Sequence, residues 1–185
     1  MARAPRQKNP GLRELKRRAK RLRLVLTDND GVLTDAGVYY PGTGETFKRF
    51  SIRDGMGVVL LRNAGVETAI ITSENCPSAR RRAEKLKMRF LFLGILDKQS
   101  HLKNILAETG VGLDSLAYIG DDVNDLEIMK EIGRQGITAC PLDAMPIIQR
   151  VAHYRCKAPG GNGAFRDLAE WLLHLRGDSH TDFRT

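Results

Sequence analysis

At 185 residues with 42% hydrophobic side chains, the chain can bury a core as one domain without disulfides or a structural metal. No apolar run could cross a bilayer and no apolar signal segment follows the basic start, so we expect a soluble, cytoplasmic protein with no membrane partner. The three cysteines, Cys76, Cys140 and Cys156, have no C-x-x-C spacing and predict neither a disulfide framework nor a zinc site.

The formal net charge of +8 is concentrated at the start of the chain. Residues 1–23 hold ten lysines and arginines and one acid, a net charge of +9, so the other 162 residues sum to −1. A basic segment of this kind can bind RNA, a membrane surface or an acidic partner, but a solvated, partly helical leader is the simpler interpretation. We therefore take residues 1–23 as a basic leader and expect no nucleic-acid partner.

From residue 24 the chain alternates continuous apolar runs with helical patterns, which is typical of parallel βαβ units. We expect strands within 22–30, 66–75, 89–95, 116–122 and 136–140, and helices within 55–65, 76–88, 98–110, 123–133 and 164–175. Such uniformly apolar strands are covered by helices on both faces of a sheet. The prediction is an α/β fold with a doubly wound, Rossmann-like parallel sheet over residues 24–176, followed by a flexible tail at 177–185.

One segment interrupts this alternation directly after the first strand. Residues 37–50 contain two strand-like pieces around a Pro-Gly-Thr-Gly turn, a pattern that predicts a β-hairpin. Ligands bind beyond the carboxyl ends of the strands in a doubly wound sheet. We therefore expect the hairpin to flank the functional site as a flap.

Carboxylates follow the first and the fourth strand. Asp28 and Asp30 can serve one site in two roles, one as a nucleophile toward phosphorus and the other as the group that handles the proton of the leaving oxygen. Asp121, Asp122 and Asp125 crowd at the start of a helix. The helix dipole alone favours acids there, but three acids in five positions indicate a hard cation bound through oxygen.

Hydroxyls and a lysine follow the two strands in between. Thr72 and Ser73 end one strand, although such hydroxyls usually satisfy the local backbone when they occur alone. Lys98 could balance the charge of a phosphoryl group, although a lone lysine is more simply a surface residue. Together, four successive strand ends bring carboxylates, hydroxyls, a lysine and further carboxylates to one edge of one sheet.

This joint pattern resembles the haloacid dehalogenase superfamily from about residue 15 to residue 175. The four motifs of that superfamily appear in order as Asp28-x-Asp30, Thr72, Lys98 and Gly120-Asp121-Asp122-x-Asn124-Asp125. The resemblance implies a phosphatase in which Asp28 attacks phosphorus in line and becomes an aspartyl phosphate. Asp30 would first protonate the departing alkoxide and then deprotonate the water that hydrolyses this intermediate.

The resemblance also implies a Mg²⁺ cofactor. The ligands would be a side-chain oxygen of Asp28, the backbone carbonyl of Asp30 and Asp121, with several waters retained by this small hard ion. The phosphoryl oxygens would be held by Thr72, Ser73 and Lys98. The metal ligands would be supported by Asn124 and Asp125.

The lack of room for a cap domain is typical of one branch of the superfamily. Only the hairpin follows the first motif, and 25 residues separate Thr72 from Lys98. The chain resembles the capless branch of 3-deoxy-manno-octulosonate 8-phosphate phosphatases and nonulosonate 9-phosphate phosphatases, in DGVLTD, in Arg53-Asp54-Gly55 and in Gly160-Gly161-Asn162-Gly163-Ala164. That branch implies a homotetramer in which a neighbour's hairpin and glycine-rich tail replace the cap. The tail residues here would be Gly160, Gly161, Gly163 and Arg166, and the alternative is a simple glycine turn before the last helix.

The second motif departs from the octulosonate pattern. Octulosonate-type members usually read Thr-Gly-Arg, whereas this chain reads Thr72-Ser73-Glu74, with Lys85 eleven positions later, which looks like the nonulosonate type. Loss of an arginine removes a partner for a sugar carboxylate, while an acid accepts hydrogen bonds from hydroxyl or acylamino groups. Glu74, Lys85 and Arg53 are the specificity candidates, and solvated surface charges are the alternative for Glu74 and Lys85.

A second departure is Asn29, where a hydrophobic residue is usual in the resembling family. Its side chain is expected to point away from the chemistry, so it puts no catalytic group in doubt.

The predicted function is a Mg²⁺-dependent phosphatase of a 2-keto-3-deoxy sugar acid phosphate. A nonulosonate 9-phosphate is favoured, and octulosonate 8-phosphate is the alternative substrate. The alternative from another class is a non-catalytic oligomerising domain, because such domains also occur fused to sialic-acid cytidylyltransferases. The four intact motifs argue against it, since a domain kept only for assembly has no need of them.

Overall fold

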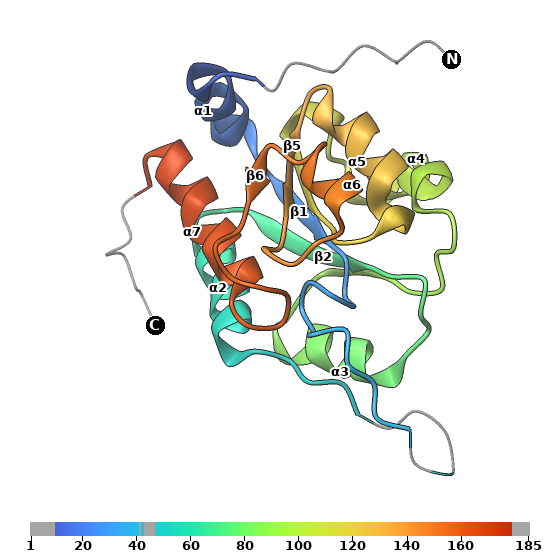
Figure 1. Ribbon diagram of the computed structural model, residues 1–185. Helices are drawn as coiled ribbons and strands as arrows, with labels where there is room; N and C mark the ends of the chain where they lie inside the picture. Colours follow the sequence, from blue (N-terminus) through green and yellow to red (C-terminus); the bar gives the residue numbers. More distant parts are fainter. Residues whose placement is uncertain (1–9, 41, 43–46, 179–185) are drawn as a thin grey trace.

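A six-stranded parallel sheet forms the centre of the computed structural model, which describes residues 10–40, 42 and 47–178 (Figure 1). The strand order is β3-β2-β1-β4-β5-β6. The strands are β1 (Leu24–Thr27), β2 (Glu67–Ile71), β3 (Phe90–Phe92), β4 (Leu116–Ile119), β5 (Ile137–Cys140) and β6 (Tyr154–Arg155). The order reverses between β1 and β4, which is where ligands bind in doubly wound sheets. The predicted α/β fold is therefore confirmed.

Helices bury the sheet on both faces, and Figure 1 shows α1, α2 and α7 on one side and α4, α5 and α6 on the other. Their bounds are α1 (Leu12–Arg21), α2 (Ile52–Asn63), α3 (Pro77–Lys85), α4 (Lys98–Thr109), α5 (Leu126–Gly133), α6 (Pro146–Gln149) and α7 (Ala164–Arg176), with short 3-10 turns η1 (Leu113–Ser115) and η2 (Val123–Asp125). Side chains along β1 alternate between the two layers, with Val25 in the first core cluster and Leu24 and Leu26 in the second. This two-residue period lets one strand close both cores.

Part of the segment predicted as a basic leader is a helix of the domain. In α1, Leu15 and Ala19 are buried in the same core cluster as α7. The guanidinium of Arg18 donates to the carbonyls of Gly133 and Gly136 at 2.9 and 2.7 Å. Residues 12–21 thus belong to the folded domain, which differs from the predicted boundary at residue 24, and residues 1–9 lie outside the described part of the chain.

The segment predicted as a hairpin pairs within itself at one point and with the loop before it at another. Antiparallel bridges join Thr34 to Phe50 and Tyr39 to Phe47, while most of the predicted turn lies outside the described residues. The predicted tail is also outside them from residue 179. Helix α7 ends at Arg176 and is capped by Gly177, whose φ of +85° suits a glycine.

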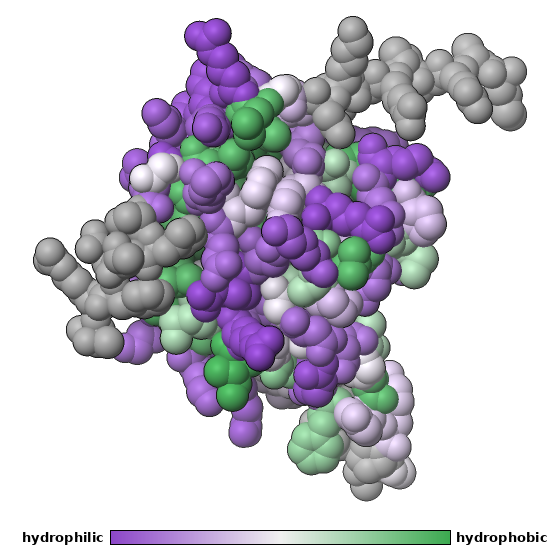
Figure 2. All heavy atoms as spheres, turned by 60° about the vertical axis from the view of Figure 1, so that its left-hand side comes forward, coloured by the Kyte–Doolittle hydropathy of each residue, from purple (hydrophilic) through white to green (hydrophobic). Residues whose placement is uncertain are grey.

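The outer face of the layer that carries α1, α2 and α7 is mostly hydrophilic, with small separate apolar groups (Figure 2). Every helix among the described residues is too short or too polar to cross a bilayer.

Candidate active site

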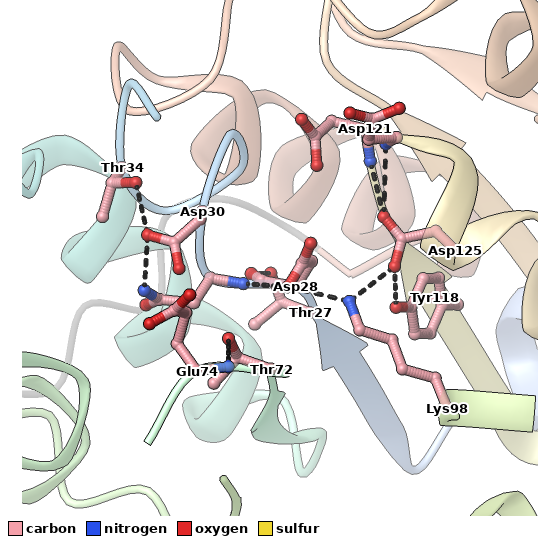
Figure 3. Close-up of polar contacts among 12 residues, drawn as sticks. Thr27, Asp28, Asp30, Thr34, Thr72, Glu74, Lys98, Tyr118, Asp121 and Asp125 are labelled. Atoms are coloured by element: carbon pink, nitrogen blue, oxygen red, sulfur yellow. Dashed lines mark hydrogen bonds and ion pairs between the residues drawn. The ribbon is translucent and has the colours of Figure 1, made fainter. Parts of the chain in front are cut away.

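Most of the residues predicted to carry chemistry line one cleft at the carboxyl ends of the strands, and Lys98 and Asp125 are buried next to it (Figure 3). Asp28 directly follows β1, Thr72 directly follows β2, and Asp121 lies just beyond β4. The cleft has a volume of about 340 Å³. The predicted residues among those that line it are Asp28, Asp30, Thr72, Ser73, Glu74, Asp121 and Asn124. Parallel strands end at the same edge of a sheet, which explains how motifs almost 100 residues apart meet here.

Lys98 joins the nucleophile candidate to a second buried acid. Its ammonium lies 2.9 Å from Oδ1 of Asp28 and 2.7 Å from Oδ1 of Asp125, and its side chain is fully buried. The backbone N–H of Asn29 also donates to Oδ1 of Asp28, at 2.7 Å. Among the described residues, Oδ2 of Asp28 is therefore the oxygen left for an attack on phosphorus.

Asp125 is the centre of a hydrogen-bond network behind the cleft. Its Oδ1 accepts from Lys98 and from the hydroxyl of Tyr118, at 2.7 and 2.5 Å. Its Oδ2 accepts from the backbone N–H groups of Asp121 and Asp122. Asp125 therefore fixes the loop that carries Asp121. Tyr118 was not predicted to belong to the site, because a tyrosine in an apolar strand has no signal that separates it from a core residue.

The carboxylate of Asp30 is held by three donors, two from its own loop and one from the hairpin. Lys48 lies 3.0 Å from each of its two oxygens, and the Thr34 hydroxyl and the Asn29 amide donate to Oδ1 at 3.3 and 3.1 Å. The expectation that the side chain of Asn29 points away from the chemistry is wrong, because its neighbour Asp30 accepts a hydrogen bond from it. Lys48 was missed as well, since nothing in a run of hairpin residues marks it apart from Arg49.

Thr72 and Ser73 line the same cleft as the acids. The hydroxyl oxygen of Thr72 accepts the backbone N–H of Glu74 at 3.1 Å, which fixes the side chain and leaves its proton free to donate. A hydroxyl placed in this way suits an anionic oxygen such as that of a phosphoryl group.

Burial and crowded acids shift the ionisation of the site. Burial and the charge of Asp125 raise the pKa of Asp28 well above its ordinary value, against the opposing effect of Lys98. Burial, followed by Asp125, raises the pKa of Asp121 to about 7. Burial disfavours the charge on Lys98, but Asp28 and Asp125 outweigh it and raise its pKa. The site therefore holds more negative charge than one lysine neutralises.

The arrangement fits a divalent cation. Single oxygens of Asp28, Asp121 and Asp125 lie within 4.8 Å of one another, and Oδ1 of Asp121 is buried without a hydrogen-bond partner among the described residues. Asp125 is already engaged by Lys98 and Tyr118, so Asp28 and Asp121 are the available ligands. Carboxylate oxygens are the ligands that Mg²⁺ prefers. The proposed contribution of the Asp30 carbonyl stays a prediction.

A glycine lets the two acidic loops approach each other. Gly31 has a φ of +84°, and a Cβ there would lie 2.0 Å from Oδ2 of Asp121. Only glycine combines this backbone with this contact.

No family model matches the chain. The 3-deoxy-D-manno-octulosonate 8-phosphate phosphatase KdsC of Haemophilus influenzae is 33% identical over 165 residues, which cover 89% of this chain and 90% of the relative. This chain belongs to the KdsC family of haloacid dehalogenase phosphatases. It is accordingly a phosphomonoester hydrolase.

Solved structures of KdsC phosphatases share this fold closely. The enzyme from Moraxella catarrhalis, solved with a magnesium ion, a phosphate ion and a KDO molecule, matches with a TM-score of 0.83 and 32% identity, over 90% of this chain and 94% of that one. The cobalt-bound enzyme from Haemophilus influenzae matches with a TM-score of 0.83 and 32% identity, over 91% and 96% of the two chains.

The three specificity candidates lie in different places. Glu74 is exposed and lines the cleft. Lys85 is exposed in a second, basic hollow between α3 and the hairpin, which shares Lys48 with the cleft. Arg53 is exposed at the start of α2. Within one described chain, only Glu74 is brought to the catalytic residues.

The glycine-rich segment that resembles the KdsC-family tail packs against the catalytic loop of its own chain. A Cβ on Gly160 would lie 1.9 Å from the carbonyl oxygen of Gly31, and the N–H of Gly161 donates to the carbonyl of Val32 at 2.9 Å. The backbone N–H groups of Gly163 and Arg166 donate to the buried carboxylate of Asp54. The segment is thus a brace between α2, α7 and the loop that follows Asp30.

Proposed function

We propose that this KdsC-family phosphatase hydrolyses a phosphorylated 2-keto-3-deoxy sugar acid with Mg²⁺, and that it prefers a nonulosonate 9-phosphate. The observation that carries the preference is Glu74, which faces the substrate cleft beside Thr72. A carboxylate at this position replaces the arginine that would pair with a sugar carboxylate, and it accepts hydrogen bonds from hydroxyl or acylamino groups of the substrate. The second candidate substrate is octulosonate 8-phosphate, after which the curated relatives are named.

The proposed chemistry assigns a role to each residue of the cleft. Oδ2 of Asp28 attacks phosphorus, the ester P–O bond breaks, and Asp30 gives a proton to the departing alkoxide. Water then attacks the aspartyl phosphate, its proton passes to Asp30, and phosphate leaves Asp28. Thr72 and Lys98 hold the phosphoryl oxygens in place, while bound Mg²⁺ supplies neutralisation of negative charge as a Lewis acid.

The first experiment is phosphate release from a small panel of esters. The panel holds octulosonate 8-phosphate, two nonulosonate 9-phosphates and simple sugar phosphates, each with Mg²⁺, with Co²⁺ and with a chelator. We expect Mg²⁺-dependent turnover that favours the nine-carbon esters and disappears in Asp28→Asn. Absence of turnover for every ester would contradict the proposed function and favour the non-catalytic alternative.

Variants of Glu74 separate substrate choice from catalysis. We expect Glu74→Arg to shift the ratio of kcat/KM values toward the eight-carbon ester by about tenfold or more, the value of one charge-assisted hydrogen bond. Glu74→Gln tests the charge alone. Glu84→Arg introduces the same residue at an exposed position of α3 and should leave the ratio unchanged. A ratio that does not respond to Glu74→Arg would show that Glu74 does not determine substrate choice, and it would not count against the phosphatase activity.

We also propose a homotetramer in which hairpins cover neighbouring clefts. Tyr39, Tyr40 and Phe47 on the hairpin are 64%, 74% and 66% exposed, and Tyr40 lines the cleft. Large apolar side chains gathered in this way mark association surfaces. Light scattering after size exclusion should give four times the chain mass, and Phe47→Ser should reduce it. A monomeric wild type would contradict the proposal.

A further inference from the structure

The carboxylate of Asp30 is oriented by contacts that the four catalytic motifs do not contain. Thr34 and Asn29 both donate to its Oδ1, at 3.3 and 3.1 Å. Only Lys48, among the described residues, reaches both oxygens, with its ammonium 3.0 Å from each. A planar carboxylate that is held at one oxygen can still rotate about that contact, so the second oxygen is what fixes its plane.

The environment of Lys48 is that of an interior group rather than a surface charge. Its side chain is 2% exposed, although it comes from the hairpin, and it lines the cleft beside Asp28 and Asp30. The other charged residues lining the cleft are all acids: Asp28, Asp30, Glu74, Asp121 and Asp122. Because the lysine side chain is shielded from solvent, this ion pair is screened less than a surface pair, although the Asp30 side chain is 27% exposed.

Asn29 adds a second sign that this arrangement is specific. Its side chain is fully buried, and while its amide nitrogen donates to Asp30, its Oδ1 has no hydrogen-bond partner among the described residues. An unsatisfied buried carbonyl oxygen is unfavourable. The loop therefore keeps the Asn29 amide as a donor to Asp30, although this leaves Oδ1 of Asn29 buried without a hydrogen bond.

We propose that Lys48 is a positioning residue that orients Asp30 for the hydrolysis of the aspartyl phosphate, an inference that rests on the proposed function. In this half-reaction a bond forms between water oxygen and phosphorus, the bond between phosphorus and the Asp28 oxygen breaks, and the water proton passes to Asp30. The carboxylate must face the water while Asp28 carries the phosphoryl group. Lys48, which acts through Asp30 and not on the substrate, sets that orientation from the hairpin.

The test measures the two half-reactions separately with 4-nitrophenyl phosphate, whose leaving group departs without a proton. Rapid quench gives the rate at which hydroxylamine-sensitive phosphoprotein forms and the rate at which it decays. In Lys48→Met we expect formation to stay within about twofold of wild type and decay to slow by about tenfold or more, so that phosphoprotein accumulates. Lys48→Arg, which keeps a cation, should retain most of the decay rate.

A matched control removes a cation from the same segment without touching Asp30. Arg49 is 48% exposed in its side chain and pairs with Asp35 and Asn162. Arg49→Met should leave both rates near wild type, and thermal melting of all variants identifies any that fail to fold.

A double-mutant cycle decides whether the effect passes through Asp30. In an Asp30→Asn background, Lys48→Met should slow decay by less than about twofold, because the group that it orients is gone. Additive losses, or a rise in KM without phosphoprotein accumulation, would overturn the inference and assign Lys48 to substrate binding. Failure of the wild type to form any phosphoprotein would instead count against the proposed function itself.

Discussion

Removal of the buried lysine should destabilise the metal-free protein strongly. Lys98 is the cation between Asp28 and Asp125, at 2.9 and 2.7 Å, and its side chain is fully buried. Lys98→Met keeps the length of the side chain but leaves two buried carboxylates without their counter-charge. The loss of one partner of a buried ion pair costs about 3 to 5 kcal/mol of unfolding free energy.

The loss of unfolding free energy in Lys98→Met should depend on pH. In the variant the acids can escape repulsion by taking up a proton, since burial already raises the pKa of Asp28 and of Asp121. The loss should therefore be largest near pH 8 and shrink toward pH 5. Mg²⁺ should recover part of it at pH 8, because the cation neutralises the same carboxylates.

Urea denaturation at pH 5 and pH 8, with and without Mg²⁺, measures these differences. Lys103→Met is the matched control, because Lys103 is an exposed lysine on the same helix α4 and should change stability by no more than about 0.5 kcal/mol. A loss below about 1 kcal/mol for Lys98→Met at pH 8 would refute the account of Lys98 as the counter-charge of the site.

Four further outcomes follow from the same geometry. Because the pKa of Asp121 is raised to about 7, Mg²⁺ must displace a proton below that pH, and calorimetry should show affinity about tenfold weaker at pH 6 than at pH 8. The same raised pKa means that, between about pH 4 and pH 7, Asp121 in the folded, metal-free protein holds a proton that the unfolded chain has released. The contribution of Asp121 to stability therefore falls as pH rises through this range. Stabilisation by Mg²⁺ in thermal melts should grow from pH 6 to pH 8. Tyr118→Phe, which removes a donor to Asp125, should lower the unfolding free energy in urea by about 1 to 2 kcal/mol, and an unchanged value would show that the contact contributes nothing. Gly160→Ala places a Cβ 1.9 Å from the carbonyl oxygen of Gly31, so we expect a loss of about 1 to 3 kcal/mol in urea denaturation together with lower phosphatase activity.

The sheet and the catalytic edge were predictable because their signals are local. Apolar runs such as those of β1 and β4 are typical of strands. Each is followed within two residues by an acid, which is not expected in a hydrophobic core. Once the strands are parallel, the meeting of Asp28 with Asp121 follows from topology alone. The pattern therefore predicts both the fold and the position of the site.

The groups that support the site were not predictable in the same way. In the sequence, Tyr118 looks like a core residue of β4 and Lys48 like one of several hairpin cations. Only the folded chain brings Tyr118 to Asp125 and Lys48 to Asp30. The packing of α1 was also hidden, because two buried side chains, Leu15 and Ala19, are outnumbered by the charges around them. Such residues act through tertiary contacts that leave no periodic trace in the sequence.

The Arg53-Asp54-Gly55 motif and the glycine-rich motif that begins at Gly160 are joined by hydrogen bonds to Asp54. Asp54 of the Arg53-Asp54-Gly55 motif is 1% exposed, and it accepts the backbone N–H groups of Gly163 and Arg166 at the start of α7. Burial raises the pKa of Asp54, and these backbone donors oppose that rise. A carboxylate at a helix N-terminus is favoured by the helix dipole as well as by the free N–H groups.

This contact connects helix α2 to the catalytic loop. Asp54 fixes the start of α7, the glycine segment that leads into α7 then lies against Gly31, and Gly31 directly follows Asp30. Asp30 is thus held through its backbone by the glycine segment on one side and through its carboxylate by Lys48 from the hairpin on the other. A capless phosphatase has no second domain to order its catalytic loop, and in this chain the two short segments that supply that order come from positions 48 and 160, far from Asp30 in sequence.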